Sequence, residues 1–243
     1  MKIIAGKLYK KINLVLIFIL LLSCCSCSLN NDSKKYLEEK YDDTFTELGH
    51  KNHGSYSISW FESKTYPELY VEVEKDKDPK EYFDNYNLQY IAYNFSNEIK
   101  ETIKEDISNC FVYTSYDVII DTNTEFKGIE ELHKDKDNSV DVFPYIFIEE
   151  DYATKENIYK AAQKLRNNYS NICGTFKFIV VKNNSIKRIK KSIQKYQTLN
   201  PGDFYEEILY ESKSISLSPN LKIHSYFIFD DYSFPTEQDF WEY

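Results

Sequence analysis

An apolar stripe at helical spacing, flanked by strand-like segments, constrains the fold of this chain most. Apolar residues recur every three or four positions from Leu88 to Ile107, which predicts a long helix with one buried face. Ser55–Glu62 and Glu68–Glu74 alternate apolar and polar residues as paired strands do, and Phe111–Ile120 is a further predicted strand. A helix with one apolar face needs a sheet to cover, so this region predicts helix-on-sheet packing.

The second half of the chain again alternates predicted strands with predicted helices. Pro144 lies in the first predicted strand of the second half. Proline lacks the backbone N–H that would pair with a neighbouring strand, so we expect this strand to lie at a sheet edge or to start late. Thr154 is a predicted helix cap. The expected elements are strand Val142–Glu149, a helix carrying Ile158, Ala162 and Leu165, strand Thr175–Val181, helix Ser185–Tyr196, and strands near Glu207–Leu217 and Ile223–Phe229.

These patterns predict an α+β protein made of two small helix-on-antiparallel-sheet lobes. We expect the lobes at residues 33–126 and 127–243, with their boundary in Lys127–Asn138. The strand–helix–strand order fits either a parallel crossover or a helix packed over antiparallel strands.

The first 27 residues predict an export signal. Four lysines precede an unbroken apolar run, Leu14–Leu22, and small residues follow it. Nine apolar residues are too few for a transmembrane helix, which needs about 20.

The segment Leu21-Leu22-Ser23-Cys24 resembles the lipobox of bacterial lipoproteins. The resemblance implies that Cys24 carries diacylglycerol after signal peptidase II removes residues 1–23. Residues 24–32 then form a tether, and the protein lies on the outer face of the bacterial cytoplasmic membrane. Cys25 and Cys27 are alternative lipidation sites, and an ordinary cleaved signal or a short anchor is the alternative interpretation.

A second resemblance lies just beyond the tether. Tyr36-Leu37-Glu38-Glu39-Lys40-Tyr41, followed by Phe45, is similar to the opening of many uncharacterised exported proteins from Gram-positive bacteria. The resemblance implies a helix that leads into a first strand. It covers roughly residues 33–120 and implies no activity.

Charge limits the partners. The full chain carries −9, and loss of four signal-peptide lysines leaves 26 basic and 39 acidic residues, a charge of −13. Nucleic acid is excluded as an expected partner, because phosphate binding needs surplus Lys and Arg. Protein or peptide partners and membrane lipid are the expected ones.

One dense basic block stands out in this acidic chain. It consists of Lys187, Arg188, Lys190, Lys191 and Lys195 on a predicted amphipathic helix. In an anchored protein these cations are candidates for contact with anionic headgroups. The alternative is an ordinary surface helix whose lysines balance acids elsewhere.

The tail is rich in aromatic residues. Docking on the protein's own body or contact with a partner would shield such a strip from water. The candidate contacts are Phe234, Phe240, Trp241 and Tyr243.

Motifs for catalysis and cofactors are missing from the sequence. There is no glycine-rich phosphate loop and no Gly-x-Ser-x-Gly elbow, so we expect no cofactor and no catalytic residue. His50 and His53 are the nearest approach to a metal pair, but flanking glycines favour a loop, and zinc needs three or four ligands.

Two further pairings stay open. Glu149-Glu150-Asp151 and Asp230-Asp231 both follow predicted strands, so a shared sheet end is able to bring them together, although acids also mark solvated turns. Cys110 and Cys173 either pair or remain two buried thiols.

Two functions follow as hypotheses. The first is a non-catalytic, membrane-anchored module that holds a protein or peptide partner through an aromatic, acidic surface. The second is a binder or carboxylate-based hydrolase of envelope carbohydrate, with a cleft beside Trp60 or a tyrosine.

Overall fold

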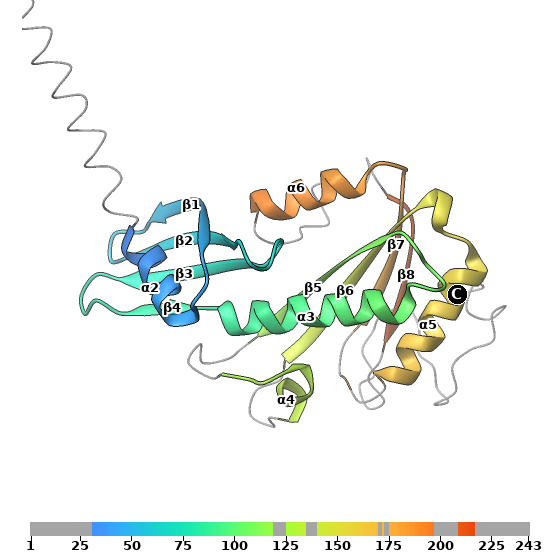
Figure 1. Cartoon of the computed structure of the whole chain (residues 1–243), viewed down its shortest axis with the longest axis horizontal. Coiled ribbons are helices and arrows are strands. Elements are labelled where there is room, and N and C mark those ends of the chain that lie inside the picture. The colour runs from blue at the N-terminus through green and yellow to red at the C-terminus, as the bar shows by residue number, and fades with distance from the viewer. Residues whose placement is uncertain are drawn as a thin grey trace, which may run out of the picture. The chain divides into compact units, whose positions relative to one another are not determined.

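The computed structural model describes six stretches of the chain (Figure 1), which are residues 31–118, 125–134, 140–169, 172, 175–196 and 209–216. The chain divides into two compact units. The first comprises Met1–Pro67 and Glu72–Phe83, and the second comprises Glu68–Val71 and Asp84–Tyr243. The predicted signal peptide and tether lie outside the described residues. Among those residues, no helix has the length and apolar character needed to cross a membrane.

The first unit pairs one helix with one sheet. Helix α2 spans Asn31–Tyr41, and the sheet has the order β1-β2-β3-β4. Its strands are β1 (Phe45–Asn52), β2 (Tyr56–Ser63), β3 (Tyr70–Asp76) and β4 (Tyr82–Asp84). Strand β1 runs antiparallel to β2, with an irregularity between Glu47 and Gly49.

The second unit carries a longer sheet of order β5-β6-β7-β8. Its strands are β5 (Cys110–Val118), β6 (Val140–Glu149), β7 (Thr175–Val181) and β8 (Leu209–Ser216). The β6–β7 pair is parallel, and the two outer pairs are antiparallel. The helices are α3 (Tyr86–Ile103), α4 (Ile129–Lys134), α5 (Lys155–Asn168) and α6 (Ile186–Tyr196), and a 3-10 turn spans Glu150–Tyr152.

The α+β prediction of two helix-on-sheet lobes is confirmed. Antiparallel pairs dominate both sheets, and α5 provides the one described parallel crossover, from β6 to β7. Thr154 caps α5 as predicted, because its side chain accepts a hydrogen bond from the backbone N–H of Asn157 at 3.1 Å.

The compact units divide at a different place from the predicted lobes. We predicted the boundary in Lys127–Asn138, whereas the units separate mainly between Phe83 and Asp84. Helix α3 causes the difference. Its stripe, including Phe95 and Ile99, is buried in one apolar cluster with residues of β5, β6 and β7, so α3 belongs to the second sheet.

The second sheet has helices over both faces. Val112, Ile146 and Phe178 lie in the cluster that also holds α3 and α5. Neighbouring strand residues point to opposite faces, so Phe111 points away from that cluster. Helix α6 lies over this other face, where the Lys190 ammonium is 4.7 Å from the Phe111 ring centre. Figure 1 shows α6 on one side of the sheet and α3 and α5 on the other.

Pro144 lies in an inner strand. Strand β6 has β5 on one side and β7 on the other, so the predicted edge position is wrong. The β7 ladder, however, starts at Tyr145 opposite Lys177. The missing N–H of Pro144 therefore interrupts no bond to β7. The predicted late start is also wrong, because β6 begins at Val140 and pairs with β5 from there on.

Candidate functional site

Several predicted site residues fall outside the described residues. These are the lipidation candidates Cys24, Cys25 and Cys27, the tail contacts Phe234, Phe240, Trp241 and Tyr243, the acids Asp230 and Asp231, and Cys173. The strand expected near Ile223–Phe229 is also outside them. These assignments remain predictions.

The basic residues of α6 divide into two groups. Lys190 is half-buried, and its Nζ lies 2.5 Å from Glu68 Oε1, so part of its charge is balanced within the second unit. The other four cations, Lys187, Arg188, Lys191 and Lys195, are exposed. Ile189 and Ile193 are fully buried on the opposite side of the helix. The amphipathic character predicted for this helix is therefore present.

The Glu149-Glu150-Asp151 cluster holds the turn that leads into α6. Glu149 Oε1 accepts a hydrogen bond from the backbone N–H of Ile186 at 3.5 Å, and Glu150 Oε1 accepts one from Asn183 at 3.4 Å. A carboxylate at a helix N-terminus is favourable because unpaired N–H groups and the helix dipole concentrate positive charge there. The Glu149 and Glu150 carboxylates therefore stabilise the turn before α6.

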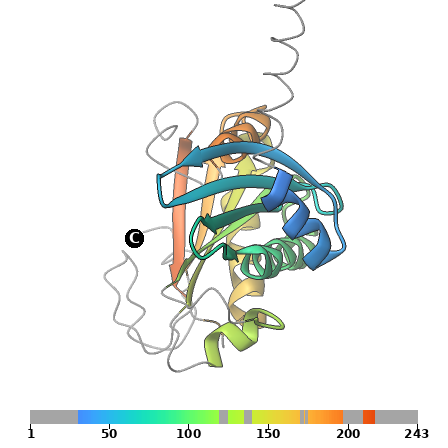
Figure 2. The same ribbon diagram turned by 90° about the vertical axis from the view of Figure 1, so that its left-hand side faces the viewer.

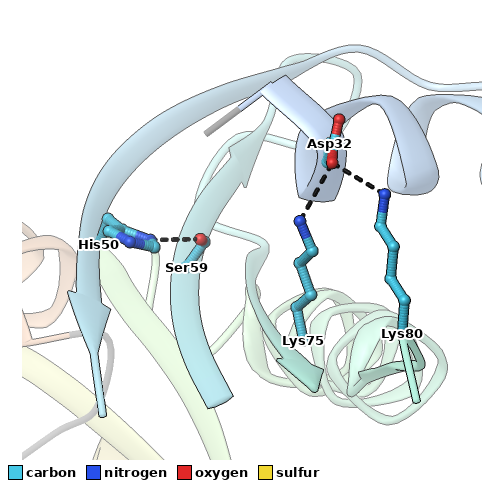
Figure 3. Close-up of polar contacts among 5 residues, drawn as sticks. All are labelled: Asp32, His50, Ser59, Lys75 and Lys80. Carbon is cyan, nitrogen blue, oxygen red and sulfur yellow. Dashed lines mark hydrogen bonds and ion pairs between the residues drawn. The ribbon is translucent and has the colours of Figure 1, made fainter. Parts of the chain in front are cut away.

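His50 and His53 do not meet in a metal site. Among the described residues, no cluster of three or more His, Cys, Asp or Glu is arranged to hold a metal ion. His50 lies in strand β1, so the predicted loop is wrong there, and its Nδ1 is 2.9 Å from Ser59 Oγ (Figure 3). His53 stacks on Tyr56, with ring centres 4.8 Å apart. Gly49 did not end the strand because it pairs with Trp60 beside the β1 irregularity.

Asp32 locks the first helical turn to the sheet. Its Oδ2 accepts hydrogen bonds from Lys80 at 2.9 Å and Lys75 at 3.0 Å (Figure 3). These bonds from Lys80 and Lys75 hold the pKa of Asp32 at about 2. Sequence reasoning missed this arrangement, which we call the Asp32 clamp, because the lysines lie more than 40 positions away in a charged segment that resembles a loop.

Aromatic stacking reinforces the Asp32 clamp. Tyr36 of α2 stacks on Tyr82 of β4, with ring centres 4.7 Å apart and planes 11° apart. The ammonium groups of Lys75 and Lys80 lie 5.7 and 5.8 Å from the Tyr82 ring centre, within cation–π range. The start of the described fold is thus held by both charge and ring contacts.

Asp43 organises a buried polar cluster at the end of α2. Its carboxylate accepts hydrogen bonds from Ser63 Oγ and Thr65 Oγ1, both at 2.5 Å, and from the Thr44 N–H at 2.6 Å. Burial alone would raise the pKa of Asp43, but the Ser63, Thr65 and Thr44 bonds outweigh it and leave the pKa below its ordinary 3.8.

The sheet face opposite α2 carries an aromatic residue among acids. Lys75 and Val73 point towards α2, so Glu72 and Glu74, one position away, point to the other face. Trp60 lies on that face too, because its Nε1 donates to Glu72 Oε2 at 2.7 Å. We call this surface the Trp60 face; its residues are Ile58, Trp60, Glu62, Glu72 and Glu74, all half-buried.

Cys110 is a buried thiol. It is buried as a free thiol in the apolar cluster of the second unit. Burial raises the pKa of this thiol to about 11, so it is protonated at neutral pH.

Comparison with known proteins supports the fold alone. No protein-family model and no curated protein sequence matches this chain. The crystal structure of a DUF5037 family protein from Ruminococcus gnavus is similar, with a TM-score of 0.56 and 16% identity, covering 77% of this chain and 90% of that chain. At that identity the similarity extends to the arrangement of helices and strands and not to activity.

Proposed function

We propose that this chain is an exported lipoprotein, anchored through Cys24, that works at the membrane surface as a non-catalytic interaction module. The observation that carries the anchor is the lipobox-like segment Leu21-Leu22-Ser23-Cys24, and the Asp32 clamp, which holds the first turn of α2 on the sheet, sets how close the fold begins to it. Asp32 follows Cys24 by about eight positions, and an extended chain spans at most about 3.6 Å per residue, or about 29 Å. The first unit would therefore stay near the headgroups.

The non-catalytic part of the proposal rests on how the candidate chemical groups are used. Glu149 and Glu150 accept backbone hydrogen bonds at the start of α6, and His50 pairs with Ser59 inside the first sheet. Catalytic carboxylates and histidines need access to a substrate. Groups that hold turns and strands together are better explained as structural.

Lipid contact by α6 is the second part of the proposal. Its four exposed cations, Lys187, Arg188, Lys191 and Lys195, would lie against anionic headgroups, each contributing about 1 kcal/mol near the surface. Lys190 is expected to add less, because it is half-buried whereas the other four cations are exposed.

The anchor is tested by growing cells with labelled palmitate. Wild-type protein and the control variants Cys25→Ser and Cys27→Ser should incorporate label and sediment with membranes, whereas Cys24→Ser should do neither. Labelled, membrane-bound Cys24→Ser protein would overturn the assignment.

Lipid contact is tested on protein that begins at Ser28, without the signal peptide and the lipidation cysteines, with vesicles containing phosphatidylglycerol. Replacing the four exposed cations with Gln should abolish sedimentation with these vesicles, while Lys190→Gln should reduce it little. Unchanged binding of the fourfold variant would exclude the α6 contact.

A further inference from the structure

The Trp60 face combines a fixed aromatic ring with several acids. Trp60 is held in place by its 2.7 Å bond to Glu72, and it lies opposite Gly49 of β1. The ring atom Cε3 is 3.6 Å from the point that a Cβ on Gly49 would occupy, so the glycine leaves the ring next to bare backbone. An indole that is already oriented loses little conformational entropy when a ligand stacks on it.

Charge on this face has one dominant sign. Glu62 follows Trp60 by two positions on β2, so alternation places both on one face, and Glu72 and Glu74 supply two further carboxylates from β3. Lys51 of β1 is opposite Ile58, so register places a cation on this face as well. Three carboxylates around an indole suit a ligand with spaced positive charges, since Lys and Arg pair with carboxylates and lie over aromatic rings.

The spacing of the two acids on β3 favours an extended peptide as the ligand. Glu72 and Glu74 are two positions apart on one strand, which separates their side chains by about 6.6–6.8 Å. Alternate side chains of an extended peptide have the same spacing, so lysines at positions i and i+2 match the two acids. The charge of −13 on the mature chain would also speed the approach of a basic partner.

We infer that the Trp60 face binds an extended, basic segment of a partner protein, with alternate cationic side chains on Glu72 and Glu74 and one stacked on Trp60. The inference rests on the proposed role as an interaction module and names its partner's chemistry. Anionic lipid and nucleic acid are repelled by this face, and a neutral sugar gains nothing from three carboxylates.

The test uses the full-length protein in neutral detergent and a fluorescein-labelled peptide with five Lys-Thr repeats. Wild-type protein should bind this peptide more tightly than one of equal composition whose five lysines are contiguous. The double variant Glu72→Gln/Glu74→Gln should bind at least about tenfold more weakly. The amide introduced by Glu72→Gln keeps an oxygen that accepts the Trp60 N–H, so the fold is retained.

A matched control removes the same charge elsewhere. Glu98→Gln/Glu101→Gln alters two exposed acids of α3 in the second unit, and its affinity should stay within about twofold of wild type. Trp60→Ala should also weaken binding about tenfold, with Trp60→Phe between it and wild type. Equal losses in both double variants would indicate unspecific charge attraction and overturn the inference.

Other occupants give different results. Binding of a neutral N-acetylglucosamine oligomer that Trp60→Ala abolishes, without peptide binding, would identify a carbohydrate face and overturn the inference. A concentration-dependent dimer lost in Glu72→Gln/Glu74→Gln, again without peptide binding, would identify a second copy as the occupant and overturn it too. The palmitate experiment reports on anchoring alone, so failure of the anchor and failure of this face are distinguishable.

Discussion

The two sheets differ in how their faces are covered. In the second unit, α3 and α5 pack on one face and α6 on the other, and residues such as Phe147 and Phe178 are almost completely buried. In the first unit, α2 covers one face, and the residues of the Trp60 face are only half-buried. The view in Figure 2 shows α2 beside the strands of the first sheet.

The buried faces also differ in polarity. The buried side of β2 carries Ser57, Ser59 and Ser63 beside a single Phe61, and hydrogen bonds involving His50 and Asp43 satisfy Ser59 and Ser63. The second unit instead buries a large apolar cluster. The comparison shows that the second sheet is covered by helices on both faces, whereas the Trp60 face of the first sheet is only half-buried, and the proposed recognition surface lies on that face. Each prediction below tests that division.

The largest effect is expected in the apolar cluster. Phe95→Ala removes a ring that is 1% exposed and contacts the rings of Tyr169 and Phe176. The cavity should lower the free energy of unfolding by about 3–5 kcal/mol, measured by urea denaturation. A loss below about 1 kcal/mol would show that the second unit does not depend on this core.

The polar cluster of the first unit should give the next largest effect. Asp43→Asn removes the charge that Ser63, Thr65 and the Thr44 N–H stabilise, and should cost about 1–3 kcal/mol at pH 7.

The same cluster predicts a pH dependence. The pKa of Asp43 is lower in the folded state, so its stabilisation is present above the ordinary 3.8 and is lost as the pH falls through the folded value. Wild-type stability should therefore drop more steeply than that of Asp43→Asn when urea titrations are repeated from about pH 5 to about pH 2. Parallel curves would contradict the assigned hydrogen bonds.

The helix cap should have a smaller effect. Thr154→Ala deletes the bond to the Asn157 N–H and should lower the unfolding free energy by about 1 kcal/mol, whereas Thr154→Ser should retain most of it. Equal losses in the two variants would assign the effect to packing of the methyl group.

The smallest effect on stability is expected on the Trp60 face. Glu74→Gln should change the unfolding free energy by no more than about 0.5 kcal/mol, because its side chain is half-buried at the surface. Its effect should appear in peptide affinity. A large loss of stability would mean that the face is a structural one.

Local patterns made much of the fold predictable. The α3 stripe, the Thr154 cap and the bounds of β7 all depend on residues close together in the sequence. Long-range contacts were not predictable in the same way. The Asp32–Lys80 bond spans 48 positions, and the short strand β4 has too few residues for an alternating pattern.

The candidate site was harder to predict than the fold. Trp60 was recognised as a candidate aromatic, but its bond to Glu72 depends on the pairing of neighbouring strands. The observed unit boundary differs from the predicted one because periodicity shows that α3 has an apolar face, and does not show which sheet that face covers.

Hydrogen exchange of the full-length protein, with and without the Lys-Thr peptide, tests the central claim most directly. Bound peptide should slow exchange in β2 and β3 and leave β6 and β7 unchanged, because the first sheet is the proposed recognition surface. Protection confined to β6, β7 or α6, or no protection at saturating peptide, would contradict the account.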